Sequence, residues 1–394
     1  MISVSEAKNI IEESIAALAP VEILLQDAAG LVLADDVFAN TDVPAFNQSA
    51  MDGYAFLFAD WLEHKKLKIA GEIQAGMTET ITLVTGQAIR IFTGAPLPQG
   101  ADTVVMQEKV TIVNGELFIT DENIQAGRNK RPIGSEIKAG SVALNKGSIL
   151  SPAAIGFLAG IGIYKVPVYP RPSVSIIVTG KELMPPGNLL KQGEVFESNS
   201  YALKAALNQL HYTNINVRHC DDLLELLTTQ LQEALIESEL IILTGGVSVG
   251  DYDFVLKAAA LCEVETRFHK VKQKPGKPLY LGVKGIKPVF GLPGNPSSVL
   301  TCFYQYVVPA LGKLSKHQNA IKTIEAPLAK TYEKPEGITH FLKAFYDGDM
   351  VTALDAQESY KMSSYARANC LVEIAEQCNM CNVGEMVKIH LLPE

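Results

Sequence analysis

Residues 240–261 read LIILTGGVSVGDYDFVLKAAAL, and this stretch decides the fold class. Leu240–Leu243 is a short apolar run of the kind that forms a buried strand, and Phe254–Leu261 follows it as a short helix. The glycine-rich residues between them connect the carboxyl end of the strand to the start of the helix. The stretch therefore predicts one strand–loop–helix unit of an α/β sheet.

The same alternation of strand and helix continues on both sides of this unit. Strands that alternate with helices pair in parallel and are covered on both faces, so we expect a central doubly wound parallel α/β sheet domain. Its other strands are expected at Val174–Val178, Ile215–Arg218 and Val289–Phe290, and its other helices at Asn199–Leu210, Leu223–Ser238 and Ser297–Val308.

The flanking regions are rich in short β-type runs, so they are predicted to form smaller β domains. These runs are Ala88–Phe92, Thr103–Met106 and Glu116–Ile119 before the α/β part, and 341–346 and 371–374 after it. Two helices are also expected outside the central domain. One starts with a capping box made by Ser3 and Glu6, and the other begins at Ser151-Pro152 and is predicted to be buried.

Composition excludes several classes of protein. The chain has 394 residues and a net charge of −9, so it offers no general attraction to nucleic acid. Its most apolar stretch, Ile149–Tyr164, is shorter than the roughly 20 residues that a membrane span requires. The N-terminus does not resemble a secretory signal, and we therefore expect a cytoplasmic protein with reduced cysteines. Cys378 and Cys381 form a single CxxC pattern, for which strand cysteines are favoured over a four-ligand zinc site.

The glycine-rich loop after Leu243 is a candidate anion site. Gly245, Gly246 and Gly250 allow backbone N–H groups to turn towards a phosphate, and Ser248 adds a hydroxyl donor at the positive end of the next helix. A tight strand-to-helix turn without a ligand would have the same composition. Both interpretations remain open at this point.

A second loop, GLPGNPSS at 291–298, also joins a strand to a helix. Pro293 and Pro296 stiffen it, which is typical either of a pre-organised site or of a rigid turn, and Ser297 could be no more than a helix N-cap. Between the two loops lies a run of lysines that would supply a local positive field, or would form a solvated face. These are Lys270, Lys272, Lys274 and Lys277.

Acidic residues follow several of the predicted strands. Glu182, Asp222 and Asp253 can converge on one edge of the sheet, where carboxylates beside a phosphate site would hold magnesium. The alternative for the Asp221-Asp222 pair is capping of the helix that starts at Leu223.

Taken together, these segments closely resemble the molybdopterin molybdenumtransferase family (MoeA-type), which is shared with the E domain of gephyrin. The resemblance rests on TGGVSVGDYD at 244–253, KPGKP at 274–278 and GLPGNPSS at 291–298. It extends to SAMDGYA at 49–55, IFTGAPLP at 91–98, the glycine-bounded segment 127–140, and the pairs Ser363-Ser364 and Asn369-Cys370.

The resemblance implies four domains and a homodimer with an active site shared between subunits. The domains are residues 1–40 with 139–168 (domain I), 41–138 (domain II), 169–315 (domain III, which binds molybdopterin) and 316–394 (domain IV). The implied reaction inserts molybdenum from molybdate into adenylylated molybdopterin and releases AMP, with magnesium assisting. Expected partners besides the second copy are the adenylyltransferase that precedes this step and the molybdoenzymes that receive the cofactor.

The resemblance also implies roles for individual residues. Asp52 and Thr93 match contributors from domain II, and Glu182, Asp222 and Asp253 match the functional acids that would position magnesium. Substrate-side positions are Lys270, Lys274, Lys277, Pro293, Pro296, Ser297, Ser363 and Ser364, together with the loop residues Gly245, Gly246, Ser248 and Gly250.

Two positions depart from the family pattern. Glu136 stands where the family usually has an aspartate, and the start of domain IV offers only His340 and Lys343 where the family commonly has an arginine. The alternative functions are a molybdopterin adenylyltransferase, which resembles the α/β domain alone, and a gephyrin-like scaffold or binding protein.

Overall fold

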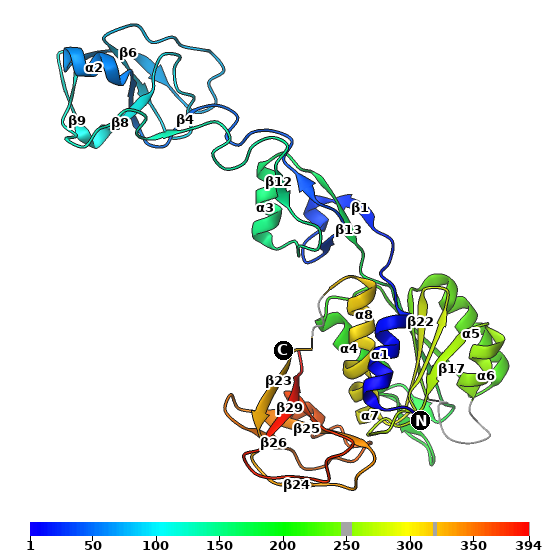
Figure 1. The fold of residues 1–394 in the computed structure, drawn as a ribbon. Coiled ribbons are helices and arrows are strands. Elements are labelled where there is room, and N and C mark those ends of the chain that lie inside the picture. Colours follow the sequence, from blue (N-terminus) through cyan, green and yellow to red (C-terminus); the bar gives the residue numbers. More distant parts are fainter. Residues whose placement is uncertain (246–253, 318–320, 394) are drawn as a thin grey trace. The chain divides into compact units, whose positions relative to one another are not determined.

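The computed structural model describes residues 1–245, 254–317 and 321–393 (Figure 1). The chain forms two compact units. One contains Met1–Val21 and Val168–Glu394, and the other contains Glu22–Pro167. The resemblance assigns residues 1–40 to domain I, whereas the first 21 residues belong to the same compact unit as the α/β sheet. Each unit is described by itself below.

A six-stranded sheet forms the centre of the first unit. Its order is β17 (Ile215–Cys220), β14 (Val174–Thr179), β18 (Leu240–Thr244), β22 (Lys287–Leu292), β21 (Tyr280–Lys284) and β19 (Glu265–His269). The first four strands are parallel, as the sequence predicts. The last two, which the sequence pattern did not reveal, pair antiparallel and extend one edge of the sheet.

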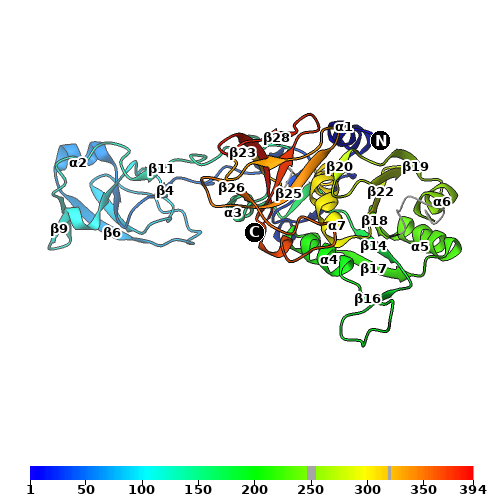
Figure 2. The same cartoon turned by 90° about the horizontal axis from the view of Figure 1, so that it is seen from below.

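Helices cover both faces of this sheet (Figures 1 and 2). Alternate residues of β14 point to opposite faces, with Ile176 packed in one core cluster and Ile177 in the other. The Ile177 face carries α5 (Leu224–Glu237) and α6 (Phe254–Leu261). The Ile176 face carries α1 (Val4–Ser14), α4 (Asn199–Gln209), α7 (Pro296–Cys302), a π-helical turn (Phe303–Val307) and α8 (Val308–Leu314).

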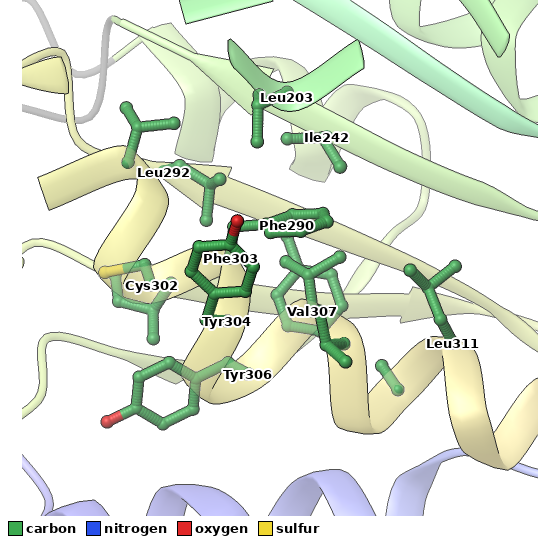
Figure 3. Close-up of a cluster of buried hydrophobic side chains, with 14 of the residues drawn as sticks. Leu203, Ile242, Phe290, Leu292, Cys302, Phe303, Tyr304, Tyr306, Val307 and Leu311 are labelled. Atoms are coloured by element: carbon green, nitrogen blue, oxygen red, sulfur yellow. The ribbon is translucent and has the colours of Figure 1, made fainter. Parts of the chain in front are cut away.

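The Ile176 face forms the larger core. Figure 3 shows Phe290 and Leu292 of β22 against Phe303 and Val307 of the π-helical turn. Helix α1 packs here too, and its capping box between Ser3 and Glu6 is present as expected. The N-terminal helix is therefore part of the unit that contains the α/β sheet.

The C-terminal part of the first unit is a second sheet. It contains β25 (Thr339–Tyr346), β27 (Cys370–Ile374), β29 (Met386–Leu391) and β23 (Thr323–Pro327), with β26 (Val351–Ala353) paired to β25. A short strand from the α/β region, β20 (Gln273–Lys274), joins this sheet parallel to β25. Two small pairs complete the unit: β24 (Tyr332–Glu333) with β28 (Met380–Cys381), and β15 (Leu183–Met184) with β16 (Val195–Phe196).

The second unit is built on its own six-stranded sheet. The order is β8 (Thr103–Met106), β5 (Gly53–Phe56), β7 (Gln87–Ile91), β6 (Leu67–Ile73), β10 (Glu116–Ile119) and β9 (Val110–Val113), flanked by α2 (Phe58–His64). Asn114 and Gly115 both have positive φ, at 50° and 81°, as the turn between β9 and β10 requires. Smaller sheets join β1 (Val21–Leu24), β13 (Lys165–Tyr169) and β2 (Val32–Leu33), β3 (Val37–Phe38) with β12 (Val142–Leu144), and β4 (Gln48–Ser49) with β11 (Lys130–Arg131).

Helix α3 (Pro152–Gly160) differs from its predicted environment. Ser151 caps it and Pro152 begins it, as expected, but Leu158 is its only buried residue. The prediction that this apolar helix is buried is therefore wrong for the single chain. No helix within the described ranges has both the length and the apolar character that crossing a membrane would take.

Candidate functional site

A cavity of about 630 Å³ lies at the carboxyl edge of the α/β sheet. Ligands of open α/β sheets bind at this edge, where strands end and loops lead into helices. The cavity brings together six of the residues that the sequence singled out: Glu182, Asp222, Gly245, Lys274, Lys277 and Pro293. Further lining residues are Thr179, Gln273, Pro275, Gly276, Pro278, Gly294, Asn295, Ser298, Ile338, Gln357 and Ser359.

Gly245 stands where β18 enters the cavity. Its φ is +88°, and a Cβ at this position would lie 2.4 Å from the Thr179 carbonyl oxygen at the end of β14. The two strand ends therefore approach each other so closely that only glycine fits. Gly246, Ser248, Gly250 and Asp253 lie outside the described residues, so their predicted roles stay predictions.

Two buried hydroxyls lie beside Gly245. Thr179 and Thr244 are 3% and 1% exposed, and within the described ranges neither Oγ1 atom has a hydrogen-bond partner. Buried polar groups are normally satisfied by protein, water or ligand. The end of β14 and the end of β18 thus retain unused hydrogen-bonding capacity at the edge of the cavity.

The lysine loop is folded tightly against the core. Gln273 is 1% exposed, and its Nε2 donates to the carbonyls of Pro275 and Gly276 at 3.1 and 3.2 Å. Gly276 has a φ of +88°, and a Cβ there would come within 2.4 Å of Cys302 Sγ. This support holds Lys274 and Lys277 at the cavity, so part of the lysine run is more than a solvated face.

The other two lysines are arranged differently. Lys270 has positive φ and uses its backbone to pair with Leu279 and Ile2, and it is absent from the lining of the cavity. Lys272 donates to Glu376 at 2.9 Å, and this hydrogen bond raises the pKa of Lys272. Only Lys274 and Lys277 of the run therefore contribute positive charge to this cavity.

The second glycine loop contacts domain IV. Asn295 Nδ2 donates to Ser359 Oγ at 2.8 Å, and the Ser297 amide donates to the Ser359 carbonyl at 3.1 Å. Asn295, not Ser297, is the N-cap of α7, and Pro296 is its first residue. The N-cap interpretation of Ser297 is therefore wrong. Its hydroxyl is buried and lacks a hydrogen-bond partner in the described part of the chain.

Two carboxylates reach the cavity. The N-cap of α5 is Leu223 and no side chain caps this helix, so capping does not account for Asp221 or Asp222. Asp222 and the exposed Glu182 line the cavity instead. Carboxylate oxygens suit magnesium, but no group of three or more acidic, histidine or cysteine side chains that could hold a metal occurs in the described residues.

Lys343 does not contact the cavity as the sequence suggested. It is 2% exposed, and its Nζ donates to the carbonyls of Ala356, Lys361 and Glu358 at 2.8, 3.0 and 3.3 Å. Since an ammonium has three protons, none remains for an anion. The lysine stabilises the loop that carries Gln357 and Ser359 to the cavity. Sequence reasoning missed these two residues, because polar loop residues without a spacing pattern give no signal.

His340 lines a second cavity of about 440 Å³, which shares Lys274, Pro275, Gln357 and Ser359 with the first. Its Nδ1 pairs with the Tyr332 hydroxyl at 2.9 Å. Burial and the charges of Lys274 and Lys334 lower the pKa of His340 to about 4. At neutral pH the imidazole is therefore uncharged, and it does not replace an arginine electrostatically.

The two predicted serines of domain IV lie apart from this lining. Ser364 is fully buried, and its hydroxyl donates to the Ala356 carbonyl at 2.8 Å, so it supports the same loop as Lys343. Ser363 is exposed and accepts a bond from Arg367 through its carbonyl. Neither side chain is among those that line the cavity.

The second unit holds the remaining predicted residues. Asp52 Oδ1 accepts hydrogen bonds from both the amide and the hydroxyl of Thr93, each at 2.7 Å. The Thr93 amide, then its hydroxyl and the nearby charge of Arg90, lower the pKa of Asp52. The hydrogen bonds between Thr93 and Asp52 are thus already formed on the surface of this unit, and they favour the ionised form of the Asp52 carboxyl group. Glu136 is exposed, and its amide donates to the Val43 carbonyl.

Three family models match successive parts of the chain. The MoeA N-terminal region (domain I and II) matches residues 2–162, a probable molybdopterin binding domain matches 175–313, and the MoeA C-terminal region (domain IV) matches 325–392. A molybdopterin molybdenumtransferase of Haemophilus influenzae is 33% identical over 404 residues, covering 100% of both chains.

The chain belongs to the molybdopterin molybdenumtransferase family. A Staphylococcus epidermidis member of this family is 35% identical, over 99% of this chain and 95% of its own. Among solved structures, a molybdopterin biosynthesis MoeA protein of Pyrococcus horikoshii superposes with a TM-score of 0.86 and 30% identity, covering 100% of both chains. The family and multidomain fold expected from the sequence are thus confirmed.

Proposed function

We propose that this chain is a molybdenum cofactor biosynthesis enzyme, a molybdopterin molybdenumtransferase. It inserts molybdenum from molybdate into the dithiolene of adenylylated molybdopterin and releases AMP. The observation that carries the proposal is the cavity at the carboxyl edge of the sheet, which is lined by two lysines and two acids, Lys274, Lys277, Glu182 and Asp222. The chain that forms this cavity matches a member of the family over its whole length. Cations and carboxylates together suit a substrate with phosphates.

The residues of the cavity have distinct roles in this reaction. Lys274 and Lys277 neutralise the phosphates, and the close approach at Gly245 lets the backbone follow the substrate. Ser359 and Asn295, which bond each other in the lining of the cavity, orient the substrate by hydrogen bonds. The other substrate-side residues that the resemblance names keep their proposed roles in substrate binding; of these, Ser364 supports the loop that carries Ser359 through its bond to the Ala356 carbonyl. The others are Lys270, Pro293, Pro296, Ser297 and Ser363, with Gly246, Ser248 and Gly250.

Magnesium is part of the proposal, and the residues fit it. Glu182 and Asp222 present carboxylate oxygens, and two ligands from protein suffice because magnesium usually takes its other ligands from phosphate and water. Asp253 is the third proposed ligand. When bound, the ion would neutralise charge that develops on the phosphoanhydride as AMP leaves.

The active form is proposed to be a homodimer with a shared site. In the family pattern, the partner subunit's Asp52 and the partner's Thr93 contribute to the cavity, together with Glu136. Helix α3 supports association, because its nine residues are all apolar or glycine while only Leu158 is buried within one copy. The preceding adenylyltransferase and the recipient molybdoenzymes are the further partners that we propose, in the cytoplasm.

Two variants of neighbouring aspartates test the site. We expect Asp222→Asn to lower the rate of AMP release from adenylylated molybdopterin and molybdate by about 100-fold, on the scale of a lost charge at a reacting group. Asp221→Asn is the control, since Asp221 does not line the cavity. Equal effects would refute the site, and a wild-type protein that releases no AMP would refute the function.

A mixing experiment tests the shared site. Asp52→Ala and Asp222→Asn chains are each expected to be inactive. If both are mixed and exchanged, half of the dimers are mixed and each has one intact site, so about a quarter of the wild-type activity returns. A site formed within one chain predicts no recovery.

The alternatives are not favoured. An adenylyltransferase corresponds to the α/β domain alone, whereas the N-terminal and C-terminal regions of this chain match the family as well. Incubation with ATP and free molybdopterin should therefore give no adenylylation. A gephyrin-like scaffold would show high-affinity capture of a receptor-like peptide without turnover.

A further inference from the structure

Cys378 and Cys381 lie in the C-terminal β region, away from the cavity: Cys378 precedes β28, and Cys381 is the last residue of that strand. Their Sγ atoms are 3.0 Å apart. Within the described ranges no other two thiols of this chain contact each other, although it has six free cysteines. Cys302 and Cys370, for comparison, are fully buried among other groups. The short distance thus distinguishes this pair from ordinary core thiols.

The backbone around the pair is fixed from several sides. Cys381 pairs with Tyr332 and Met380 with Glu333 where β28 meets β24. The Lys334 amide donates to the Asn379 carbonyl at 2.8 Å, and the Cys378 amide donates to the Ala375 carbonyl at 3.1 Å. These bonds fix the backbone that carries the two sulfurs. No acidic or histidine side chain of the described residues completes a metal site with them.

We propose that Cys378 and Cys381 form a redox-active dithiol that closes to a disulfide by exchange with a small-molecule disulfide such as oxidised glutathione. Nothing in the proposed transferase function requires this site, so the proposal is independent of it. The co-reactant is a low-molecular-weight disulfide, because Cys378 is half-buried and Cys381 only 8% exposed, so a small molecule reaches them more easily than a folded protein does.

The two thiols have unequal roles in the exchange. Cys378 is half-buried, whereas Cys381 is 8% exposed. Burial, together with Cys378, raises the pKa of Cys381 to about 12. Because Cys378 is the more exposed of the two, it first attacks the small-molecule disulfide, and the buried Cys381 is the resolving thiol.

The exchange balances in two steps. Cys378 attacks one sulfur of glutathione disulfide, the S–S bond breaks, and one glutathione leaves as a thiolate that takes up a proton. Cys381 then gives its proton to solvent and attacks Cys378 Sγ of the mixed disulfide, which expels the second glutathione. Two protein thiols are oxidised by two electrons, and one glutathione disulfide is reduced to two thiols.

The test uses the full-length native chain in glutathione buffers of increasing oxidation. After an acid quench, remaining thiols are alkylated and counted by intact mass, and peptides are mapped. We expect two thiols to be lost from the peptide that contains 378–381, about tenfold or more faster than any change at Cys220, because the local concentration of the second thiol is high. Cys220 is half-buried like Cys378, but burial and the charges of Asp222 and Asp221 raise the pKa of Cys220 to about 11, so it controls for exposure alone.

Single variants make the result decisive. Cys381→Ser should trap glutathione on Cys378, Cys378→Ser should abolish the loss of thiols from this peptide, and Cys220→Ser should change neither. The proposal is overturned if the native chain keeps all its thiols under conditions that oxidise the unfolded chain. It is also overturned if a chelator must remove a metal before the pair reacts, or if Cys381→Ser traps no glutathione.

Discussion

Lys343 offers the sharpest test of how the cavity wall is held. The variant Lys343→Met keeps an unbranched apolar stem of similar length and removes only the ammonium. That ammonium bonds three carbonyls of the loop that contains Ser359. The loop in turn bonds Asn295 and Ser297 at the start of α7. Loss of the Lys343 ammonium should therefore loosen the loop that forms one wall of the cavity, while the strand around residue 343 stays packed.

The loss of stability in Lys343→Met depends on whether each of the three carbonyls keeps another hydrogen-bond donor. The Ala356 carbonyl keeps the Ser364 hydroxyl, and the Glu358 carbonyl keeps the Lys361 amide. In the described structure, the Lys361 carbonyl has no second partner. An unsatisfied carbonyl and two lost charge-assisted bonds cost about 3 kcal/mol together, and release of a buried charge offsets about 1 kcal/mol. Burial of the ammonium lowers the pKa of Lys343, because removing the charged form from water costs free energy. The net loss of stability is about 2 kcal/mol.

The assay can separate the two units of the chain. Trp61 is the single tryptophan and lies in the unit of residues 22–167, so its emission reports unfolding of that unit. Circular dichroism during urea unfolding reports both units. Lys343→Met should lower the midpoint of the dichroism phase that belongs to the other unit and leave the Trp61 midpoint unchanged. Hydrogen exchange of residues 356–361 should become faster.

The control is Lys361→Met. Lys361 lies on the same loop, but its ammonium forms an exposed pair with Glu358 at 2.8 Å. Exposed pairs contribute little to stability, so this variant should leave both midpoints and the exchange rates unchanged. Equal destabilisation by the two variants, or unchanged exchange in Lys343→Met, would refute the assignment of Lys343 as the residue that stabilises this loop.

Three further predictions concern other groups. Burial opposes the ionisation of Glu373, but the His390 hydrogen bond and the charge of Lys8 lower its pKa to about 2. The stability that it contributes, about 3 kcal/mol by linkage, is present above pH ~4.5 and is lost as the pH falls towards 2. Glu373→Gln should therefore flatten the acid limb of the unfolding midpoint, and an unchanged limb would contradict this. Gly245→Ala should raise the KM for adenylylated molybdopterin about tenfold, because its Cβ meets Thr179. Gly187→Ala, at a similarly positive φ (+99° against +88°) with open space around it, should change the KM less than twofold; equal effects would exclude the contact as the cause. Thr93→Val removes the hydroxyl bond to Asp52 but keeps the amide bond, so it should raise the pKa of Asp52 only part of the way towards its ordinary value in a carboxylate NMR titration, and an unshifted titration would exclude the hydroxyl as a contributor.

The parallel core was predictable because its physical signal is local. Each of β14, β18 and β22 is an apolar run that a loop and a helix follow, and all six residues of β14 are buried. The antiparallel edge was not predictable in the same way. Three of the five residues of β19 are exposed, since this strand has only one neighbour and covers less of the core. Its composition, ETRFH, therefore carries neither a continuous apolar run nor a clean alternation.

The cavity was predictable only on one side. Glu182, Asp222, Gly245 and Pro293 follow predicted strands, and parallel strands bring their carboxyl ends to a common edge. Gln357 and Ser359 arrive from domain IV through contacts between residues far apart in sequence. Their position depends on Lys343, the lysine in the run FLKAF. The sequence shows this lysine but does not show the three carbonyls that it bonds. A lysine inside an apolar strand run is nevertheless a signal, because such a residue must find buried acceptors.

The lysine run shows why net charge says little about this site. Of its four members, Lys272 is neutralised by Glu376, and Lys270 uses its backbone to join the N-terminal segment. Lys274 and Lys277 face the cavity, and no acid in the described ranges lies within ion-pair distance of either. Their ammonium groups are therefore not engaged in ion pairs and can meet the substrate phosphates, although Glu182 and Asp222 line the same cavity and the chain carries a charge of −9. Reversing a surface acid elsewhere should hardly change substrate binding, whereas Lys277→Met should weaken it strongly and reduce its salt dependence. The quantity that matters is which cations remain without a partner after folding, and only the tertiary contacts determine that.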